Sequence, residues 1–394
     1  MSEHKLSRDS KLESLLNSKH IVTIEKLAVG GAGIARIQHN GKPVVAFVHR
    51  AAPQDVVEIE VISVEKSFLR ATITKIIEAS PTRRASPCSY SEHCGGCHWQ
   101  HITEVEQVYQ KELILTELLK KFAPQLSFNL SPTVQGKNTF HYRNRIQLKQ
   151  LQNQLGYFCH GTHDLIDIDS CLIADKKISE KIPSLKQSLK PSKDLVKYEL
   201  KINLKNEFEH YKIGNEGEGL SFAQVNNEIN DLLVQKTVQL VEQIQPDFLT
   251  ELYAGAGNFT FPLLNQLKSL KIESVELNSQ LTQHALKISL EKNMQKRLTV
   301  FTSDCESYVA RRPLSQKLVL LDPPRAGTSE PILKKILSQN VKNLVYISCQ
   351  PTALVRDLQY LAKQQNKFSI KYLQIFDMFP QTEHFETLVW LSTQ

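Results

Sequence analysis

The chain has 394 residues, enough for two or three domains that each bury a hydrophobic core. Its 48 Lys and Arg against 41 Asp and Glu give a formal charge of +7, which suits contact with phosphates without demanding it. No stretch reaches the roughly 18 apolar residues of a membrane span, and residues 1–19 form a polar tail unlike a signal peptide. We therefore expect a soluble, cytoplasmic protein and exclude membrane and small disulfide-stapled classes.

Residues 20–80 contain short β-branched runs separated by glycine, asparagine and proline turn signals. The runs lie at residues 21–24, 34–37, 44–48, 56–61 and 68–77. Five short strands in one small segment predict a closed β-barrel, an architecture that often binds nucleic acid. Residues 80–84 are then expected to be a linker.

Three of the seven cysteines, Cys88, Cys94 and Cys97, lie between positions 88 and 97 and surround two glycines. In a chain without a signal peptide, this crowding indicates a metal site rather than disulfides. A fourth ligand must come from elsewhere, and of the candidates Cys171 and Cys159 we prefer Cys171. The spacing does not separate zinc from an iron-sulfur cluster, because both use four thiolates.

The segment 81–225 continues with one predicted helix, at 105–122, which Thr103 and Glu106 cap. Strands are then predicted at 140–148, 155–158, 165–168, 196–204 and 208–213, with no long helix between them. This pattern favours an antiparallel domain. The run at 140–148 alternates basic or polar residues with apolar ones, so it is either an RNA-contacting strand face or a solvated one.

From residue 226 to 394 the pattern changes to a helix at 229–244 followed by alternating strands and helices, which predicts an α/β, Rossmann-like domain. The first strand leads into Gly255-Ala256-Gly257, a loop that lets a ligand lie close to the backbone. Thr260 replaces the third glycine of a dinucleotide fingerprint, so a pyrophosphate is poorly supported.

Acidic residues follow the next predicted strands of this domain, at Glu276, Asp304 and Asp322. Glu276 lies 19 residues after Gly257, a spacing that suits hydrogen bonds to ribose hydroxyls. The glycine loop and the three acids together indicate a binding site for S-adenosylmethionine. The alternative is an unrelated α/β domain with carboxylates at its rim.

Cys349 lies where a predicted buried strand at 344–348 turns into a helix. Ligands gather at the carboxyl ends of such strands, and a helix N-terminus favours a thiolate, which is the nucleophilic form. Taken alone, the same stretch also fits a buried cysteine that packs in the core and has no catalytic role. Its neighbours favour the nucleophile.

Together these motifs resemble the RNA uracil-5 methyltransferase family over nearly the whole chain, from about residue 21 to 391, and the first barrel resembles a TRAM domain, which binds RNA. The matching motifs, besides the barrel and the Gly255 loop, are Cys88-x5-Cys94-Gly-Gly-Cys97, residues 221–226, Asp322-Pro-x-Arg325-Ala-Gly327, Ser348-Cys349-x-Pro351 and residues 377–386. Gln350 stands where the family more often has Asn.

The resemblance implies that Cys349 is the nucleophile and Glu386 the general base, with Glu383 as the fallback. It implies that a 4Fe-4S cluster is bound and that a uridine of RNA is methylated, most often in 23S rRNA and alternatively in tRNA. We expect a monomer without a protein partner. The implied S-adenosylmethionine contacts are Gln224, Tyr253, Asn258, Glu276, Asp304 and Asp322, and the implied cluster ligands are Cys88, Cys94, Cys97 and Cys171.

This chemistry needs those residue types. Carbon 5 of uracil is a poor nucleophile, so a thiolate must first add to carbon 6. A carboxylate must then remove the carbon-5 proton so that the thiol can be eliminated. The target base must also leave its stack to reach the pocket.

Two other classes of protein fit part of the sequence. Asp322-Pro323-Pro324 is similar to the motif of amino-methylating enzymes, which need no cysteine, but Arg325 replaces the aromatic residue that often stacks the base there. An RNA-binding metalloprotein without activity would leave both the cofactor motifs and the nucleophile motif unexplained.

Overall fold

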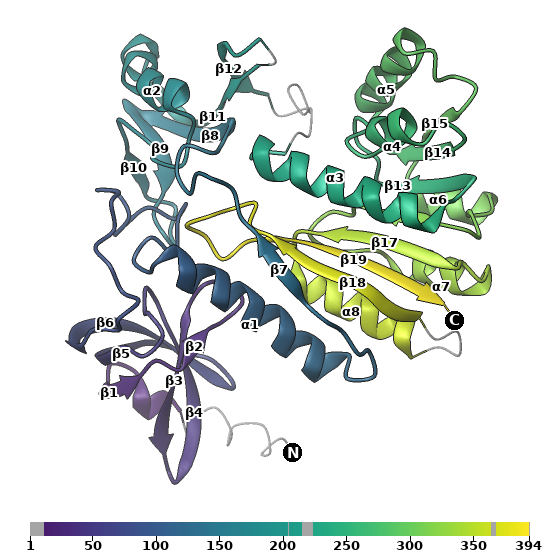
Figure 1. Cartoon of the computed structure of the whole chain (residues 1–394). Helices are drawn as coiled ribbons and strands as arrows, with labels where there is room; N and C mark the ends of the chain where they lie inside the picture. The colour runs from purple at the N-terminus through teal and green to yellow at the C-terminus, as the bar shows by residue number, and fades with distance from the viewer. Residues whose placement is uncertain (1–11, 204, 215–223, 364–367, 394) are drawn as a thin grey trace, which may run out of the picture. The chain divides into compact units, whose positions relative to one another are not determined.

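The computed structural model describes residues 12–203, 205–214, 224–363 and 368–393 (Figure 1). The chain forms two compact units, and each is assembled from several chain segments. The first unit comprises Met1–Ile114, Leu148–Val196 and Pro380–Glu383, and the second comprises Leu115–Gln147, Lys197–Phe379 and His384–Gln394. The domain boundaries expected after residues 80 and 225 stay predictions.

A six-stranded sheet near the N-terminus contains the five predicted strands and one more, β2. The strand order is β1-β5-β6-β4-β3-β2, and β1 also contacts β3. The sheet therefore curls around a core of apolar side chains that alternate along the strands. A short 3-10 helix, Glu13–Leu15, precedes it. The strands are β1 (Lys19–Thr23), β2 (Lys26–Leu27), β3 (Gly33–His39), β4 (Lys42–Val48), β5 (Val56–Val64) and β6 (Phe68–Glu78).

Residues 80–84, expected to be a linker, are instead tied to this sheet. Asp55 is fully buried, accepts hydrogen bonds from the backbone N–H groups of Ala52 and Ser80, and forms a salt bridge of 2.5 Å with Arg83. This contact could not be predicted from the sequence, because Asp55 and Arg83 are far apart along the chain.

A second sheet has the order β10-β9-β8-β11-β12, and its pairs β10 with β9, β9 with β8 and β11 with β12 are antiparallel, as predicted. Helix α1 (Glu104–Phe122) precedes it, close to the predicted bounds. The strands are β8 (Arg145–Gln152), β9 (Gln154–Phe158), β10 (Leu165–Asp167), β11 (Ser192–Ile202) and β12 (Phe208–Ile213).

Two expectations for this region were wrong. The strand predicted at 140–148 begins only at Arg145, because His141 has a positive φ of 56° and breaks the extended run. The region also contains a 13-residue helix, α2 (Lys176–Ser188), which Asp175 caps. Its apolar spacing at Ile178, Ile182 and Leu185 buries one face.

The third sheet is the Rossmann-like sheet of the second unit, with the order β15-β14-β13-β16-β17-β19-β18-β7. Strands β13 to β17 are parallel, and β19 pairs antiparallel with both neighbours. The strands are β7 (Ser131–Val134), β13 (Phe248–Leu252), β14 (Lys271–Glu276), β15 (Leu298–Thr302), β16 (Val319–Leu321), β17 (Asn343–Ser348), β18 (Phe368–Phe376) and β19 (Glu386–Thr393).

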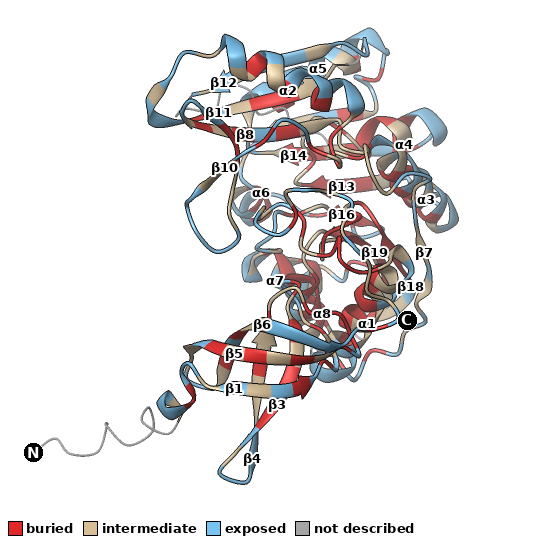
Figure 2. Cartoon of the chain, turned by 90° about the vertical axis from the view of Figure 1, so that its left-hand side faces the viewer, coloured by how far each residue is buried: buried red, intermediate tan, exposed pale blue. Residues whose placement is uncertain are grey.

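Helices cover both faces of this sheet (Figure 1), because right-handed crossovers to the left and to the right of β13 place their helices on opposite faces. The central strands are therefore buried on both sides, as Figure 2 shows for β13 and β16. The helices are α3 (Asn227–Ile244), α4 (Thr260–Gln266), α5 (Ser279–Glu291), α6 (Cys305–Arg311), α7 (Glu330–Ser338) and α8 (Pro351–Ala362).

No helix in the part of the chain that the structure describes is both long and apolar enough to cross a membrane.

Candidate active site

The glycine loop after β13 lies at the carboxyl edge of the parallel sheet. Tyr253, Gly255 and Gly257 all have positive φ, of 64°, 57° and 93°. A Cβ atom on Gly257 would come within 2.5 Å of the Phe261 ring, so both conformation and space require glycine there. The loop thus presents bare backbone where ligands of α/β proteins bind.

Glu276, the last residue of β14, is bound to this loop. Its Oε2 atom accepts a hydrogen bond of 3.0 Å from the N–H of Gly255, and its Oε1 atom accepts one of 2.8 Å from Asn278. The carboxylate is half-buried. Each oxygen keeps one lone pair for a further donor, which is what the hydroxyls of a ribose would supply.

Asn258 and Gln224 are the two amide residues among the expected cofactor contacts. The side-chain amide of Asn258 forms a reciprocal pair of 3.0 Å hydrogen bonds with that of Asn230 on α3, which fixes its orientation. The backbone carbonyl of Gln224 accepts a hydrogen bond of 3.0 Å from Asn144. Residues 221–223, which share a sequence motif with Gln224, lie outside the described residues.

The side chain of Asp304 stabilises the start of a helix. It is the N-cap of α6, and its Oδ1 atom accepts a hydrogen bond of 2.7 Å from the N–H of Ser307. That bond lowers the pKa of the exposed carboxyl group. The N–H of the preceding residue, Ser303, bonds to the backbone carbonyl of Glu276, which places Asp304 at the same edge of the sheet as the glycine loop.

Cys349 lies at the turn between β17 and α8, as predicted, and its thiol is half-buried. The expectation that the helix N-terminus favours a thiolate was wrong for the ligand-free site. The pKa of Cys349 is raised to about 11, first by burial and then by the charges of Glu386 and Asp322, whereas the charge of Arg325 acts in the opposite direction. The thiol must therefore lose a proton before it can react.

Glu386 is the first residue of β19 and is only 3 % exposed. Burial and the charge of Asp322 hold its pKa well above the usual range, against the effect of Arg325. Burial likewise raises the pKa of Asp322 to about 7. The structure thus brings Cys349, Glu386, Asp322 and Arg325 into one site, and a carboxyl group with a raised pKa suits proton transfer.

Glu383, the other candidate base, belongs to the first unit and has a partner there. Its Oε2 atom lies 2.8 Å from Nδ1 of His98. Burial lowers the pKa of His98, but the bond to Glu383 outweighs it, so that the pKa is raised overall. Glu383 is therefore the ion-pair partner of His98, whereas Glu386 is the glutamate whose charge raises the pKa of Cys349.

Glu251 is a residue of the site that sequence reasoning missed. It is 1 % exposed on β13, its Oε2 atom accepts a hydrogen bond of 2.5 Å from Thr260, and its Oε1 atom has no hydrogen-bond partner. Burial and Asp322 raise its pKa to about 8. An acid inside a buried strand just before a glycine loop is the signal that could have found it.

Four cysteines of the first unit influence one another electrostatically. The pKa of Cys94 is raised to about 11 and that of Cys97 to about 12, mainly by burial and with smaller contributions from Cys171 and Cys88. Burial also raises the pKa of Cys88, with a further contribution from Cys171. Cys159 acts in this way on Cys94 alone among these thiols.

Within the described ranges, no group of three or more His, Cys, Asp or Glu side chains is arranged to hold a single metal ion. The N–H of Gly96 lies 3.4 Å from Sγ of Cys94, and the hydroxyl of Tyr157 lies 3.7 Å from Sγ of Cys171. Donors of this kind stabilise thiolate sulfur. The four thiols are soft donors, with Cys97 and Cys171 buried and Cys88 and Cys94 half-buried, and such donors suit a soft metal centre rather than Mg²⁺ or Ca²⁺.

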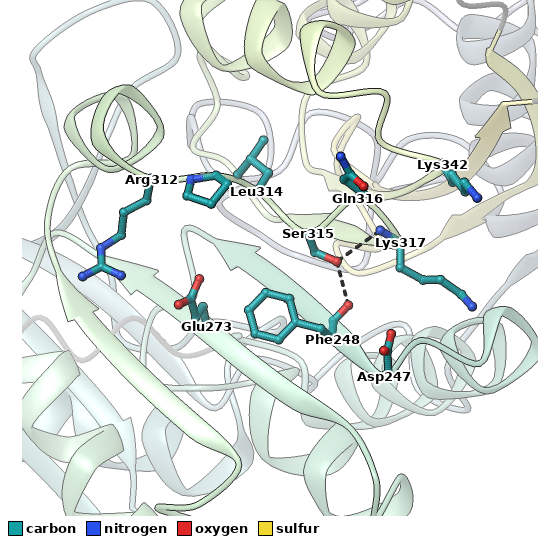
Figure 3. Close-up of a pocket in the computed structure, with 10 residues that line it drawn as sticks. Asp247, Phe248, Glu273, Arg312, Leu314, Ser315, Gln316, Lys317 and Lys342 are labelled. Carbon is teal, nitrogen blue, oxygen red and sulfur yellow. Dashed lines mark hydrogen bonds between the residues drawn. The ribbon is translucent and has the colours of Figure 1, made fainter.

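A cavity of about 470 Å³ lies at the opposite edge of the Rossmann-like sheet (Figure 3). Phe248 and Lys317 lie at or just before the amino ends of β13 and β16, and Ser315 joins them through hydrogen bonds to the carbonyl of Phe248 and from the N–H of Lys317. Because ligands of such sheets bind at the carboxyl edge, this cavity belongs to the scaffold.

Comparison with known proteins agrees with this geometry. The sequence profile of the tRNA (Uracil-5-)-methyltransferase family matches residues 184–394, and that of the TRAM domain matches residues 15–74. An uncharacterized RNA methyltransferase of Bdellovibrio bacteriovorus is 40% identical over 384 residues, covering 96% of both chains. A 23S rRNA (uracil(1939)-C(5))-methyltransferase of Shewanella woodyi is 29% identical, covering 95% of this chain and 96% of its own.

The fold is also that of a solved enzyme. The Pyrococcus abyssi tRNA (uracil-54, C5)-methyltransferase, in complex with S-adenosyl-L-homocysteine, superposes with a TM-score of 0.72 at 21% identity, covering 94% of this chain and 99% of its own. The predicted family, TRAM region and α/β methyltransferase fold are thereby confirmed. The chain belongs to the tRNA (Uracil-5-)-methyltransferase family and is an S-adenosylmethionine-dependent RNA uracil-5 methyltransferase.

Proposed function

We propose that Cys349 adds to carbon 6 of a uridine in RNA and that Glu386 removes the carbon-5 proton after methylation. The observation that supports this most is that the Glu386 carboxyl group raises the pKa of the Cys349 thiol, and that Asp322 and Arg325 act on both groups within one buried site. Addition makes carbon 5 nucleophilic, and loss of its proton expels the cysteine sulfur from carbon 6. The uracil ring is restored, and Cys349 is released unchanged.

Arg325 is the group that offsets the negative charge of this site. It lowers the pKa of both Cys349 and Glu386, against burial and Asp322, which raise them. Addition of the thiolate gives the uracil ring an enolate charge. The positive charge of Arg325 stabilises this negative charge and so favours the addition step.

S-adenosylmethionine supplies the methyl group when bound. We assign its binding to Gln224, Tyr253, Asn258, Glu276, Asp304 and Asp322. The hydrogen bond from Gly255 to Glu276 supports the assignment of Glu276, because it orients a carboxylate that can bind ribose. The hydrogen bond from Asn258 to Asn230 supports the assignment of Asn258, because it orients an amide that can bind the amino acid portion of the cofactor. Asp304 is supported only by its place at the strand end.

We propose large-subunit ribosomal RNA as the substrate, since the Shewanella woodyi relative acts on uracil 1939 of 23S rRNA by its name and matches this chain nearly end to end. A tRNA uridine is the alternative, because the matching family and the Pyrococcus abyssi structure are named for tRNA. In either case the TRAM-like segment, residues 20–80, would supply RNA contacts, and the protein would act as a cytoplasmic monomer.

Cys88, Cys94, Cys97 and Cys171 are proposed to hold a 4Fe-4S cluster. The effect of Cys171 on the pKa values of Cys88, Cys94 and Cys97 supports this set over one that contains Cys159, which contributes to the shift of Cys94. With pKa values near 11 and 12, the thiols of Cys94 and Cys97 stay protonated in the absence of a cation, so a bound cluster would stabilise their thiolate form. We assign the cluster a structural role in the first unit.

Methylation of separate transcripts tests the substrate assignment. The enzyme is incubated with S-adenosylmethionine and either a 23S rRNA fragment that contains the position equivalent to uracil 1939 or unmodified tRNA. Nuclease digestion and mass spectrometry then identify the methylated nucleoside. 5-Methyluridine in the rRNA fragment alone is expected. 5-Methyluridine in tRNA alone would replace the rRNA assignment, and a methylated amino group in either RNA would overturn carbon-5 chemistry.

A further inference from the structure

Asp357 is a buried carboxylate that the proposed chemistry does not use. It lies in the second turn of α8, the helix that follows Cys349, and is 1 % exposed. Its Oδ2 atom accepts hydrogen bonds of 2.7 Å from the hydroxyl of Tyr346 and of 2.8 Å from the N–H of Thr328. These partners come from β17 and from the loop that follows β16, so one side chain joins three segments of the second unit.

Arg356 extends the same contact. Its guanidinium group donates two hydrogen bonds, of 2.8 and 2.7 Å, to Oδ1 of Asp357, and Nη2 also donates one of 2.9 Å to the carbonyl of Ala326. Gly327, which follows Ala326 in this loop, has a φ of 81°. A Cβ atom on Gly327 would come within 2.6 Å of Arg356 and 2.7 Å of Asp357. The loop is therefore pressed against α8 with no room for a side chain.

The loop held in this way is the one that contains Asp322 and Arg325. These two residues act on the Cys349 thiol and the Glu386 carboxyl group, and Arg325 is the cation that opposes burial at both. Cys349 itself lies between Tyr346 on β17 and the start of α8 at Pro351. Asp357 thus connects the segment that carries the cation to the segment that carries the thiol.

We infer that Asp357, together with Tyr346 and Arg356, is a positioning residue that fixes Arg325 relative to the Cys349 thiol. The inference rests on the proposed role of Cys349 as the nucleophile. Asp357 touches neither substrate nor cofactor in this role. It acts through the loop of residues 322–328, whose backbone it holds at Thr328, and through α8.

Tyr346→Phe is the sharpest variant, because it removes only the hydroxyl that donates to Asp357 and accepts a hydrogen bond of 3.3 Å from the Thr328 hydroxyl, and it leaves every charge in place. The chain offers a matched control in Tyr308, whose hydroxyl donates a hydrogen bond of 2.6 Å to the carboxylate of Glu273, at the cavity shown in Figure 3. Both tyrosines are almost fully buried. Tyr308→Phe therefore makes the same chemical change away from the reacting groups.

The readout is the rate at which iodoacetamide alkylates Cys349, followed by mass spectrometry of the peptide that contains it. At about pH 8.5, below the pKa of this thiol, the rate is proportional to the fraction of thiolate. A less well-placed Arg325 raises the pKa by about 0.5 to 1 unit, which slows alkylation about threefold to tenfold. A purely structural loosening would expose the thiol and leave the rate unchanged or increase it.

We expect slower alkylation and a kcat lower by about tenfold, with an almost unchanged KM for RNA, in Tyr346→Phe and Asp357→Asn. Tyr308→Phe should match the wild type in all three quantities. An unchanged or faster alkylation rate in a folded Tyr346→Phe would overturn the inference, even if Asp357→Asn fails to fold. Full activity of Cys349→Ala would instead overturn the proposed nucleophile, so the two failures are distinguishable.

Discussion

Glu386 has the largest effect on the pKa of the Cys349 thiol of any charged side chain, after burial itself, and it raises that pKa. Glu386 begins β19, and Cys349 directly follows the neighbouring strand β17, whose ladder with β19 pairs Ser348 with Thr387. A thiol and a carboxyl group at adjacent strand ends, in a buried site, suit the two proposed steps at adjacent ring carbons, since addition would occur at carbon 6 and proton removal at carbon 5.

Glu386→Gln is expected to stop the reaction after methyl transfer. The amide cannot take the carbon-5 proton, so the enzyme should remain joined through Cys349 to methylated RNA. The adduct appears on a denaturing gel as a slow band that contains both protein and RNA. Glu383→Gln is the control, because Glu383 pairs with His98. A band with Glu383→Gln but not with Glu386→Gln would transfer the base role to Glu383.

Glu276→Ala should weaken the binding of S-adenosylmethionine by about tenfold to a hundredfold, because unpaired ribose hydroxyls cost ~1–3 kcal/mol. Titration calorimetry measures this directly. Glu273→Ala, on the same strand β14 but at the scaffold cavity of Figure 3, serves as the control and should bind the cofactor as the wild type does. Equal affinity of both variants and the wild type would place the ribose elsewhere.

The strand and glycine-loop motifs were predictable because each depends on residues adjacent in sequence. The elements around 248–260 and 344–358, and with them the place of Cys349, follow from hydrophobic runs broken by Gly or Pro. The edge strand β7 was missed, since a four-residue strand with Pro132 has no alternating pattern and forms only where β18 offers it an edge.

The pKa values and the long-range partners of charged side chains could not be predicted from the sequence. The helix N-terminus after Cys349 suggested a thiolate, yet burial and Glu386, 37 positions away in the numbering, decide the pKa instead. The partners of Glu383 and Asp55 escaped notice for the same reason. Long-range contacts depend on the packed fold, and the pKa of a buried group follows from those contacts.

Cysteine substitutions test the metal assignment. The anaerobically purified protein should be brown, absorb broadly near ~400 nm and contain about four iron atoms per chain. Cys171→Ala should lose the iron, whereas Cys159→Ala, the matched control, should keep it. Loss of iron only in Cys159→Ala would move the fourth ligand, and a colourless protein with one zinc would replace the cluster by zinc.

The buried ion pair between Asp55 and Arg83 should make the first unit sensitive to acid. The pKa of Asp55 is depressed, because hydrogen bonds from Arg83, Ser80 and Ala52 outweigh burial, which acts in the opposite direction. Its stabilisation is therefore complete above the pKa of an unfolded Asp, near ~3.9, and is lost as the pH falls through the lower folded value.

Asp55→Asn should accordingly lower the free energy of unfolding by about 3 kcal/mol at pH 7, since it leaves the mostly buried Arg83 unpaired. Denaturant titrations at a series of pH values measure the difference between variant and wild type. That difference should shrink below about pH 4. A difference that is constant with pH would show that the charge of Asp55 does not stabilise the fold.

A double-label assay tests carbon-5 methylation through Cys349 most directly. RNA carrying tritium at carbon 5 of uridine is incubated with S-adenosylmethionine labelled in its methyl group, and methyl transfer and tritium release are counted together. The wild type should give one tritium released per methyl transferred, Glu386→Gln should transfer methyl without releasing tritium, and Cys349→Ala should do neither. Methyl transfer by the wild type without tritium release, or full turnover by Cys349→Ala, would contradict the mechanism.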